Sequence, residues 1–298
     1  MNEHGTDYKG FSILLIGGLL YSLYGVFSRV IGSSIPQFFQ ISSRALIILG
    51  LLFFFIAITK TKLIKIRKED WKWGLLIAGT SGLLLPLFYI AINKLAIGTT
   101  LFSFYATSTV VSYTLGKILF KEKLNKIKIV SFFIALIGLL FLYIDTIKLG
   151  NLQFLALAAI SGALFGLNIN SVKKINNTYP TFQVNLFNWS GALIINTIIS
   201  VVLSEHANFA INTLPWIANI GLSICSLGAS FSVIYGFKFI EMQKGSIILL
   251  SELVFGVLLG LFLYREVPSS TAVVGSLLVF VALLLPNLKP VPVAKMDH

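Results

Sequence analysis

Long apolar stretches separated by short polar connections run through the whole sequence. A helix needs about 20 predominantly apolar residues to cross the hydrocarbon core of a bilayer. Ten stretches have about this length, at residues 11–28, 35–58, 73–93, 99–119, 127–144, 152–172, 180–203, 213–239, 246–264 and 268–286. The longest polar connections, 59–72 and 204–212, are too short for a separate soluble domain. The pattern therefore predicts an all-α, polytopic membrane protein with ten transmembrane helices.

The basic residues lie mostly on one side of this predicted membrane region. With the N-terminus in the cytoplasm, 18 of the 23 Lys and Arg residues fall on the cytoplasmic side, 4 on the opposite side and one, Arg44, inside a span. The positive-inside rule describes this asymmetry, so we expect both termini in the cytoplasm of a multi-pass cell-membrane protein. Contact of these basic residues with anionic lipid headgroups explains the net charge of +12. Binding to nucleic acid is not needed to explain it.

Composition narrows the possible chemistry. Only 11% of the residues are charged, against about a quarter in a typical soluble domain, which excludes a soluble enzyme. The single cysteine, Cys225, and three histidines near the termini or in a polar stretch leave no metal site inside the membrane. The chain also lacks the phosphate-binding loop of ATPases and the H-E-x-x-H motif of metalloproteases. We therefore expect no catalytic residues, no metal, no cofactor and no enzymatic activity.

The second half of the sequence repeats the first at an offset of 144 residues. Segment 98–143 aligns with 242–287, and the matched positions include Ser108 with Glu252, Ser112 with Gly256, Gly116 with Gly260 and Glu122 with Glu266. Chance similarity between two apolar stretches is the alternative. As a duplication, the chain forms two five-helix repeats, 10–144 and 150–286, with cytoplasmic tails 1–9 and 287–298. Because five is odd, the second repeat is inverted, a design of secondary transporters that bind substrate near the midplane.

These residues also carry a family resemblance. Two five-helix halves, each with "KEKL" or "REVP" between its fourth helix and a final glycine-containing helix, resemble the EamA-type drug/metabolite transporter superfamily. The family's acidic residue after the fourth helix is matched by Glu122 and Glu266, and its arginine early in the second helix by Arg44; Asn188 stands there in the second repeat. The resemblance implies a cavity walled by helices 1–4 and 6–9. It leaves the substrate open, because the superfamily carries amino acids, nucleotide sugars, amines and drugs.

Two charges lie deep in the predicted spans. Arg44 is about 14 Å from the outer end of the second span, and Glu252 is about 9 Å from the inner end of the ninth, at about 1.5 Å per residue. Charges at such depth usually face the protein interior and a partner. We expect both to face a central cavity as the poles of a substrate site, with a structural ion pair as the alternative. Glu252, the one acidic residue well inside a span, is also the candidate proton carrier if transport is proton-linked.

Other polar and aromatic residues complete the expected site. Tyr105 lies one turn from Ser108, and both are candidate substrate contacts. Tyrosines that could stack on a ligand, or simply pack, are Tyr21, Tyr24, Tyr89 and Tyr235. Asn168 and Asn188 must hydrogen-bond inside the protein, either in the cavity or between helices. Glu122 and Glu266, at span ends, are expected to form local ion pairs and cap the next helix, or to act as gates.

The sequence thus predicts a secondary or facilitative transporter that moves a small polar or amphipathic metabolite by alternating access. An amino acid or related amine is favoured, because its two charges would satisfy Arg44 and Glu252. The alternative is a non-transporting membrane protein with a lipid-handling or structural role. Expected partners are the small-molecule substrate and the lipid bilayer, with no nucleic acid, and the chain is expected to be a monomer or a homodimer.

Overall fold

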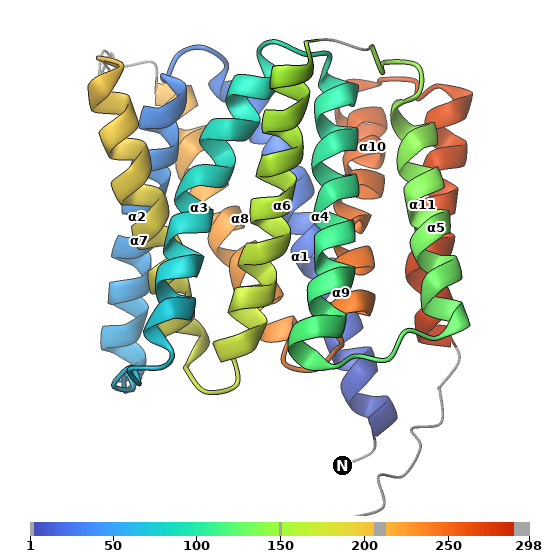
Figure 1. The fold of residues 1–298 in the computed structure, drawn as a ribbon. Coiled ribbons are helices and arrows are strands. Elements are labelled where there is room, and N and C mark those ends of the chain that lie inside the picture. The colour runs from blue at the N-terminus through green and yellow to red at the C-terminus, as the bar shows by residue number, and fades with distance from the viewer. Residues whose placement is uncertain (1–2, 149–150, 206–212, 289–298) are drawn as a thin grey trace, which may run out of the picture.

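A computed structural model describes residues 3–148, 151–205 and 213–288, and this part of the chain contains helices and no strands. The helices run roughly side by side in one bundle (Figure 1). Their bounds are α1 Glu3–Ile31, α2 Gln37–Thr59, α3 Trp71–Ile92, α4 Ile97–Phe120, α5 Lys126–Tyr143, α6 Leu152–Ile175, α7 Thr181–Val202, α8 Thr213–Gly236, α9 Met242–Leu249, α10 Ser251–Tyr264 and α11 Ser270–Leu288.

The ninth predicted span is one crossing made of two helices, α9 and α10. The sequence predicts a continuous helix there, whereas the structure has a tight turn at Leu250. The N–H of Leu250 donates to the carbonyl of Ile247, and the N–H of Leu253 donates to that of Leu250. These bonds span three residues instead of the four of an α-helix. The turn therefore places the start of α10 inside the crossing.

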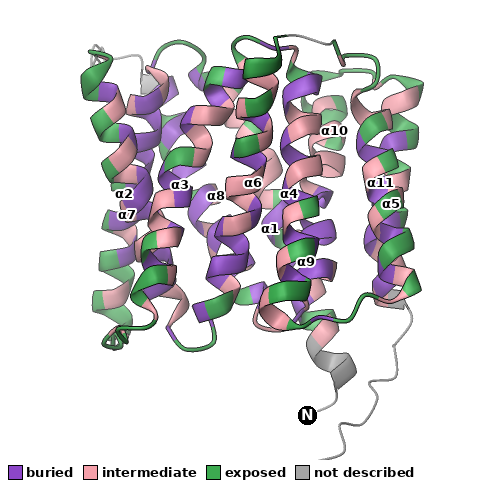
Figure 2. Ribbon diagram, viewed as in Figure 1, coloured by how far each residue is buried: buried purple, intermediate pink, exposed green. Residues whose placement is uncertain are grey.

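The helices are long and apolar enough for a membrane. Within the described residues, nine helical stretches qualify by length and hydropathy, with α9 and α10 counted together. The remaining long helix, α4, spans 24 residues and carries serine and threonine along its length. Exposed and buried positions alternate along the helices (Figure 2). The exposed residues include many Leu, Ile and Phe, whereas many Ser, Thr and Asn are buried. Polar groups inside and apolar groups outside suit a lipid environment, so this is a multi-pass membrane protein.

Helices of the first half pack against helices of the second half. The main contacts join α1 with α8, α2 with α7, α3 with α6 and α7, α4 with α6, and α5 with α11. Because almost every helix has its main neighbour in the other half, neither half has a separate core. Any substrate site in the middle of the bundle must therefore be shared between the halves.

Backbone geometry follows the 144-residue offset at which the two halves of the sequence align. Four non-glycine residues among those described have positive φ: Lys60, Lys121, Ser204 and Arg265. They form two pairs, Lys60 with Ser204 and Lys121 with Arg265. Lys60, Lys121 and Arg265 directly follow the last residue of a helix, and Ser204 follows the last residue of α7 by two positions. The left-handed conformation costs about 1–2 kcal/mol for such residues. The same helix-ending turns are therefore built in both halves, and α4 and α10 end at opposite ends of the bundle (Figure 1).

Candidate functional site

Arg44, on α2, is buried without an acidic partner. Its side chain lies with the guanidinium carbon 5.3 Å from the ring centroid of Tyr24, a cation–π contact. The residue is 2% exposed, and its Nε has no hydrogen-bond partner. Among the described residues no carboxylate forms an ion pair with it. An unpaired charge at this depth is costly and is usually kept for function.

Further unsatisfied polar atoms lie on α2 itself and on helices α1 and α8. Tyr24 and Ser28 lie one turn apart on α1, Gln40 and Arg44 lie one turn apart on α2, and each has a buried side-chain atom without a partner. Asn219, on α8, donates to Ser43 beside Arg44 at 3.0 Å, and its own oxygen is unsatisfied. Buried polar atoms are nearly always hydrogen-bonded in proteins, so such a cluster needs water or a polar ligand.

Glu252 is the second residue of α10, directly after the turn at Leu250. Its carboxylate accepts a hydrogen bond from the hydroxyl of Tyr105 on α4. The side chain is half-buried and belongs to the first turn of α10, where the free N–H groups favour a negative charge. Helix α1 approaches closely here, because a Cβ added at Gly18 would lie 3.2 Å from the backbone nitrogen of Glu252.

Tyr21 connects the two charged positions. Arg44 lies about 10 Å from the start of α2 and Glu252 about 15 Å from the start of α9, both at 1.5 Å per residue. These starts are at opposite ends of the bundle, so the two residues differ in height by roughly 10 Å. They do not form an ion pair, and Tyr21 on α1 interacts electrostatically with both. The sequence already indicated Tyr21 as one of the tyrosines that could stack on a ligand, one turn from Tyr24.

The two asparagines link helices. The Asn168 amide on α6 donates to the carbonyl of Ile77 at 3.1 Å, the hydroxyl of Thr80 at 2.9 Å and the side-chain oxygen of Asn188 at 3.2 Å. The Asn188 carbonyl accepts from Ser81 at 2.6 Å. These contacts join α6, α3 and α7, which is the helix-to-helix alternative for this pair.

The remaining candidates lie apart from the two charges or take part in packing. Tyr89 packs with the core residues Phe38 and Ile41. The backbone oxygen of Ser108 faces Gly166 of α6 at a close helix crossing. Tyr235 is partly exposed, and its hydroxyl accepts from Lys9 at 3.4 Å near the N-terminal end of the bundle. The structure therefore groups Arg44 with Tyr24, and Glu252 with Tyr105. Tyr24 also packs against the cluster that contains Tyr89, whereas Tyr235 lies apart from both charges.

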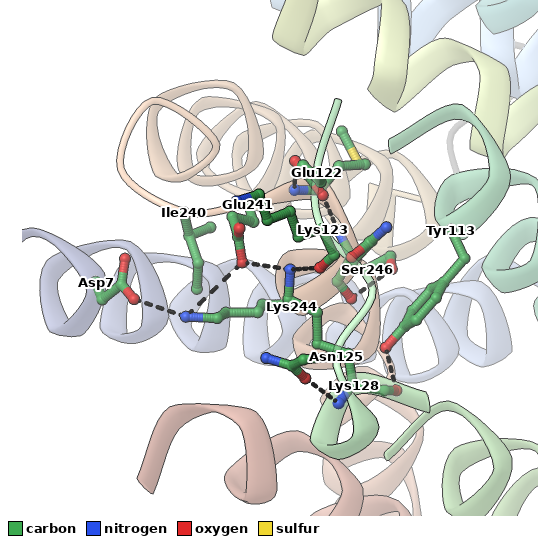
Figure 3. Close-up of polar contacts among 12 residues, drawn as sticks. Asp7, Tyr113, Glu122, Lys123, Asn125, Lys128, Ile240, Glu241, Lys244 and Ser246 are labelled. Atoms are coloured by element: carbon green, nitrogen blue, oxygen red, sulfur yellow. Dashed lines mark hydrogen bonds and ion pairs between the residues drawn. The ribbon is translucent and has the colours of Figure 1, made fainter. Parts of the chain in front are cut away.

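Glu122 caps a helix of the other half. Its two carboxylate oxygens accept from the N–H of Met242 at 2.6 Å and of Gln243 at 3.0 Å, the first two residues of α9. Its side chain is 6% exposed and lies 3.3 Å from the ammonium of Lys173. Lysine and acidic side chains gather around this helix start (Figure 3). The expectation that Glu122 pairs locally and caps the next helix, α5, is wrong, because Asn125 caps α5.

Glu266 has a different environment. Its carboxylate pairs with Arg29 of α1 at 2.5 Å, and both side chains are 52% exposed. Helix α11 starts at Ser270, and the described contacts of Glu266 include no helix start. The sequence suggested that each glutamate pairs with the basic residues beside it in the chain. Neither Glu122 nor Glu266 does so.

Two grooves on the surface lie away from the charged positions. The larger, about 740 Å³, is formed by α4 and α5 and lined mostly by apolar and aromatic residues with Lys117. The second, about 470 Å³, includes Tyr235 and Phe182. Neither is lined by Arg44 or Glu252.

Comparison with known proteins identifies the family. A protein of known crystal structure shares 16% sequence identity with this chain at a TM-score of 0.78, over 94% of this chain and 96% of the other, which shows a common fold. No curated protein matches the sequence. The model of the EamA-like transporter family matches twice, over residues 8–144 and 153–288, and confirms the resemblance to drug/metabolite transporters. With both halves matched, the chain belongs to the EamA-like transporter family.

Proposed function

We propose that this protein moves a small polar or amphipathic metabolite, preferably an amino acid or related amine, across the cell membrane by alternating access. The observation that carries the proposal is the pair of charges at Arg44 and Glu252. They belong to opposite halves, lie inside the bundle and do not pair with each other. A zwitterionic substrate would bridge them.

The chemistry of the two positions suits the two ends of an amino acid. The guanidinium of Arg44 can hold a carboxylate through two parallel hydrogen bonds, and its Nε is free to donate. The Glu252 carboxylate, already held by Tyr105, can accept from an ammonium group. Tyr24 and Tyr21 supply aromatic surface between them. In transporters of inverted-repeat design, substrates bind beside discontinuous helices, and Glu252 directly follows such a break.

Glu252 is also the proposed proton carrier if transport is coupled to a proton gradient. It is the one described acidic residue well inside a crossing, and an apolar environment favours its neutral form. Facilitated transport is the alternative, in which Glu252 only binds substrate. Uptake of the same substrate with and without a pH gradient distinguishes the two, and Glu252→Gln should abolish coupling in the first case.

The test is uptake of a labelled metabolite panel by the purified protein in proteoliposomes, with Arg44→Gln as the key variant. Arg44 has no ion pair to lose, so the variant should keep its melting temperature and lose affinity for substrates that carry a carboxylate. Arg67→Gln is the matched control, because Arg67 lies in an exposed connection. Unchanged uptake in Arg44→Gln would refute the site. A large loss of stability would indicate a structural role, and no uptake of any panel member would favour a non-transporting membrane protein.

A further inference from the structure

Glu122 and Glu266 begin from the same local structure at opposite ends of the bundle. Each follows a left-handed residue, Lys121 or Arg265, with φ of 55° in both. The N–H of Glu122 donates to the carbonyl of Gly116 at 3.3 Å, and the N–H of Glu266 donates to that of Gly260 at 3.2 Å. The backbone therefore offers both carboxylates equivalent positions, and only their side-chain partners differ.

Each of the two glutamates forms an ion pair with a basic residue at its own end of the bundle. Glu122 pairs with Lys173 of α6, and Glu266 pairs with Arg29 of α1. Lys173 and Arg29 are themselves 144 residues apart, so they are equivalent positions of the two halves. Because the ion pair exists at both ends, it does not distinguish them.

Capping of a helix start by the glutamate distinguishes the two ends of the bundle. Glu122 caps the start of α9, and the equivalent helix start is that of α4. At α4 the N-cap residue is Ala96, which has no side chain able to cap. In the described part of the chain, the N–H groups of Ile97 and Gly98 have no hydrogen-bond acceptor. The first N–H groups of a helix need an external acceptor. The start of α4 therefore lacks the carboxylate cap that the start of α9 has, and Thr146 packs against it at Gly98.

Helix packing shows the same difference between the ends. Gly162 and Gly166 of α6 both contact α4, and Ser112 of α4 is fully buried. In the equivalent helix pair, α1 with α10, Gly18 contacts the start of α10, but Gly25, two turns further on the same face of α1, has nothing within 4 Å of an added Cβ.

Gly256 of α10 is also open. It is equivalent to the buried Ser112, yet nothing lies within 4 Å of a Cβ added there. The bundle is therefore closed where Glu122 caps α9 and looser where Glu266 lacks a helix start.

We propose that the two carboxylates exchange helix caps during transport. When Glu122 caps the start of α9, it closes the N-terminal end of the bundle, which is the end at which α1 begins. In the alternate state Glu266 caps the start of α4 and closes the opposite end. Each carboxylate keeps its basic partner and gains or loses the two N–H donors. This inference rests on the proposed alternating access, and it assigns to Glu122 and Glu266 the positioning of α9 and α4 around the substrate site.

The ionic surroundings favour the state seen here. At the start of α9, Lys128 pairs with Glu241 at 2.9 Å, and Lys244 pairs with Asp7 at 2.8 Å (Figure 3). At the start of α4 the positions equivalent to Glu241 and Lys128 are uncharged, Ile97 and Ala272. The N-terminal end therefore has charge pairs that the opposite end lacks, and the protein without substrate should rest with that end closed.

The test uses cysteine reporters at the two equivalent positions, Ser112→Cys and Gly256→Cys, each in a Cys225→Ser background. The reaction rate with a charged methanethiosulfonate is measured on purified protein in detergent without substrate. Glu122→Gln should speed labelling at position 112 and slow it at position 256, each by about fivefold, the effect expected for loss of one helix cap. Glu266→Gln, the matched variant, should leave position 112 slow and position 256 fast.

Other results would overturn the exchange. If Glu122→Gln leaves both rates unchanged, or raises both, the carboxylate is only a structural cap or its loss merely loosens the fold; elution profile and melting temperature identify the latter. Since labelling needs no substrate, it separates the two proposals. Opposed changes in the two labelling rates, without uptake of any metabolite, would uphold the cap exchange and refute the proposed substrates. Uptake of a metabolite with unchanged labelling rates would uphold the proposed function and refute the cap exchange.

Discussion

Replacing Gly162 by alanine should force α6 and α4 apart beside the proposed substrate site. A Cβ at this position would lie 2.1 Å from the carbonyl oxygen of Phe104, 2.8 Å from its carbonyl carbon and 2.9 Å from its Cα. These are backbone atoms, so no side-chain rotation relieves the contact. Bringing the shortest contact to the usual lower limit of 3.0 Å requires a local separation of about 1 Å.

The energetic cost follows from that displacement. Overpacking of a close-packed interior typically costs about 1–3 kcal/mol, and the helix propensity of alanine returns at most about 1 kcal/mol relative to glycine. The net loss should be about 1–2 kcal/mol. Tyr105 follows Phe104 and donates to Glu252, so the same displacement should weaken that hydrogen bond and lower transport.

Thermal unfolding of the purified protein in detergent, together with uptake in proteoliposomes, measures both effects. Gly79→Ala on α3 is the matched control, because nothing lies within 4 Å of a Cβ there and the change should be neutral or slightly stabilising. If Gly162→Ala melts at the temperature of Gly79→Ala and transports normally, the crossing is not as tight as the structure requires and the reasoning fails.

Two further predictions concern other helix contacts. Asn168→Leu should lower stability by about 1–2 kcal/mol, since it removes the hydrogen bonds that join α6 to α3 and α7; lost transport at an unchanged melting temperature would instead place Asn168 in the substrate path. Hydrogen bonds from Thr271 and Ser269 hold the pKa of the exposed Asp145 carboxyl below its ordinary value. Their stabilising effect is therefore present at neutral pH and lost as the pH falls through the folded-state pKa. Thr271→Val should raise the pKa of Asp145 in a carbon NMR titration, and an unchanged titration would contradict this.

The membrane-spanning plan followed from the sequence because lipid leaves the backbone few options. Every N–H and C=O in the bilayer must be satisfied within the chain, so long apolar stretches form helices whatever their neighbours are. The repeat was also readable, since residues such as Pro36 and Pro180 mark equivalent helix starts at the 144-residue offset. Arg44 and Glu252 stood out because charged residues are rare in such stretches.

The partners of polar side chains required the tertiary structure. Glu122 lies beside Lys121 and Lys123 in the sequence, yet it caps a helix that starts 120 residues later. The turn at Leu250 has no proline or glycine at its position to predict it, and only the structure shows that α1 packs against the start of α10 through Gly18. Hydropathy is a local property and is recorded residue by residue, whereas hydrogen bonds and close crossings depend on which helices the fold brings together. The sequence therefore determined that this protein spans a membrane as a duplicated helical bundle, and only the packed structure decided which charges are paired, which are left without an ion pair and which helix start each carboxylate caps.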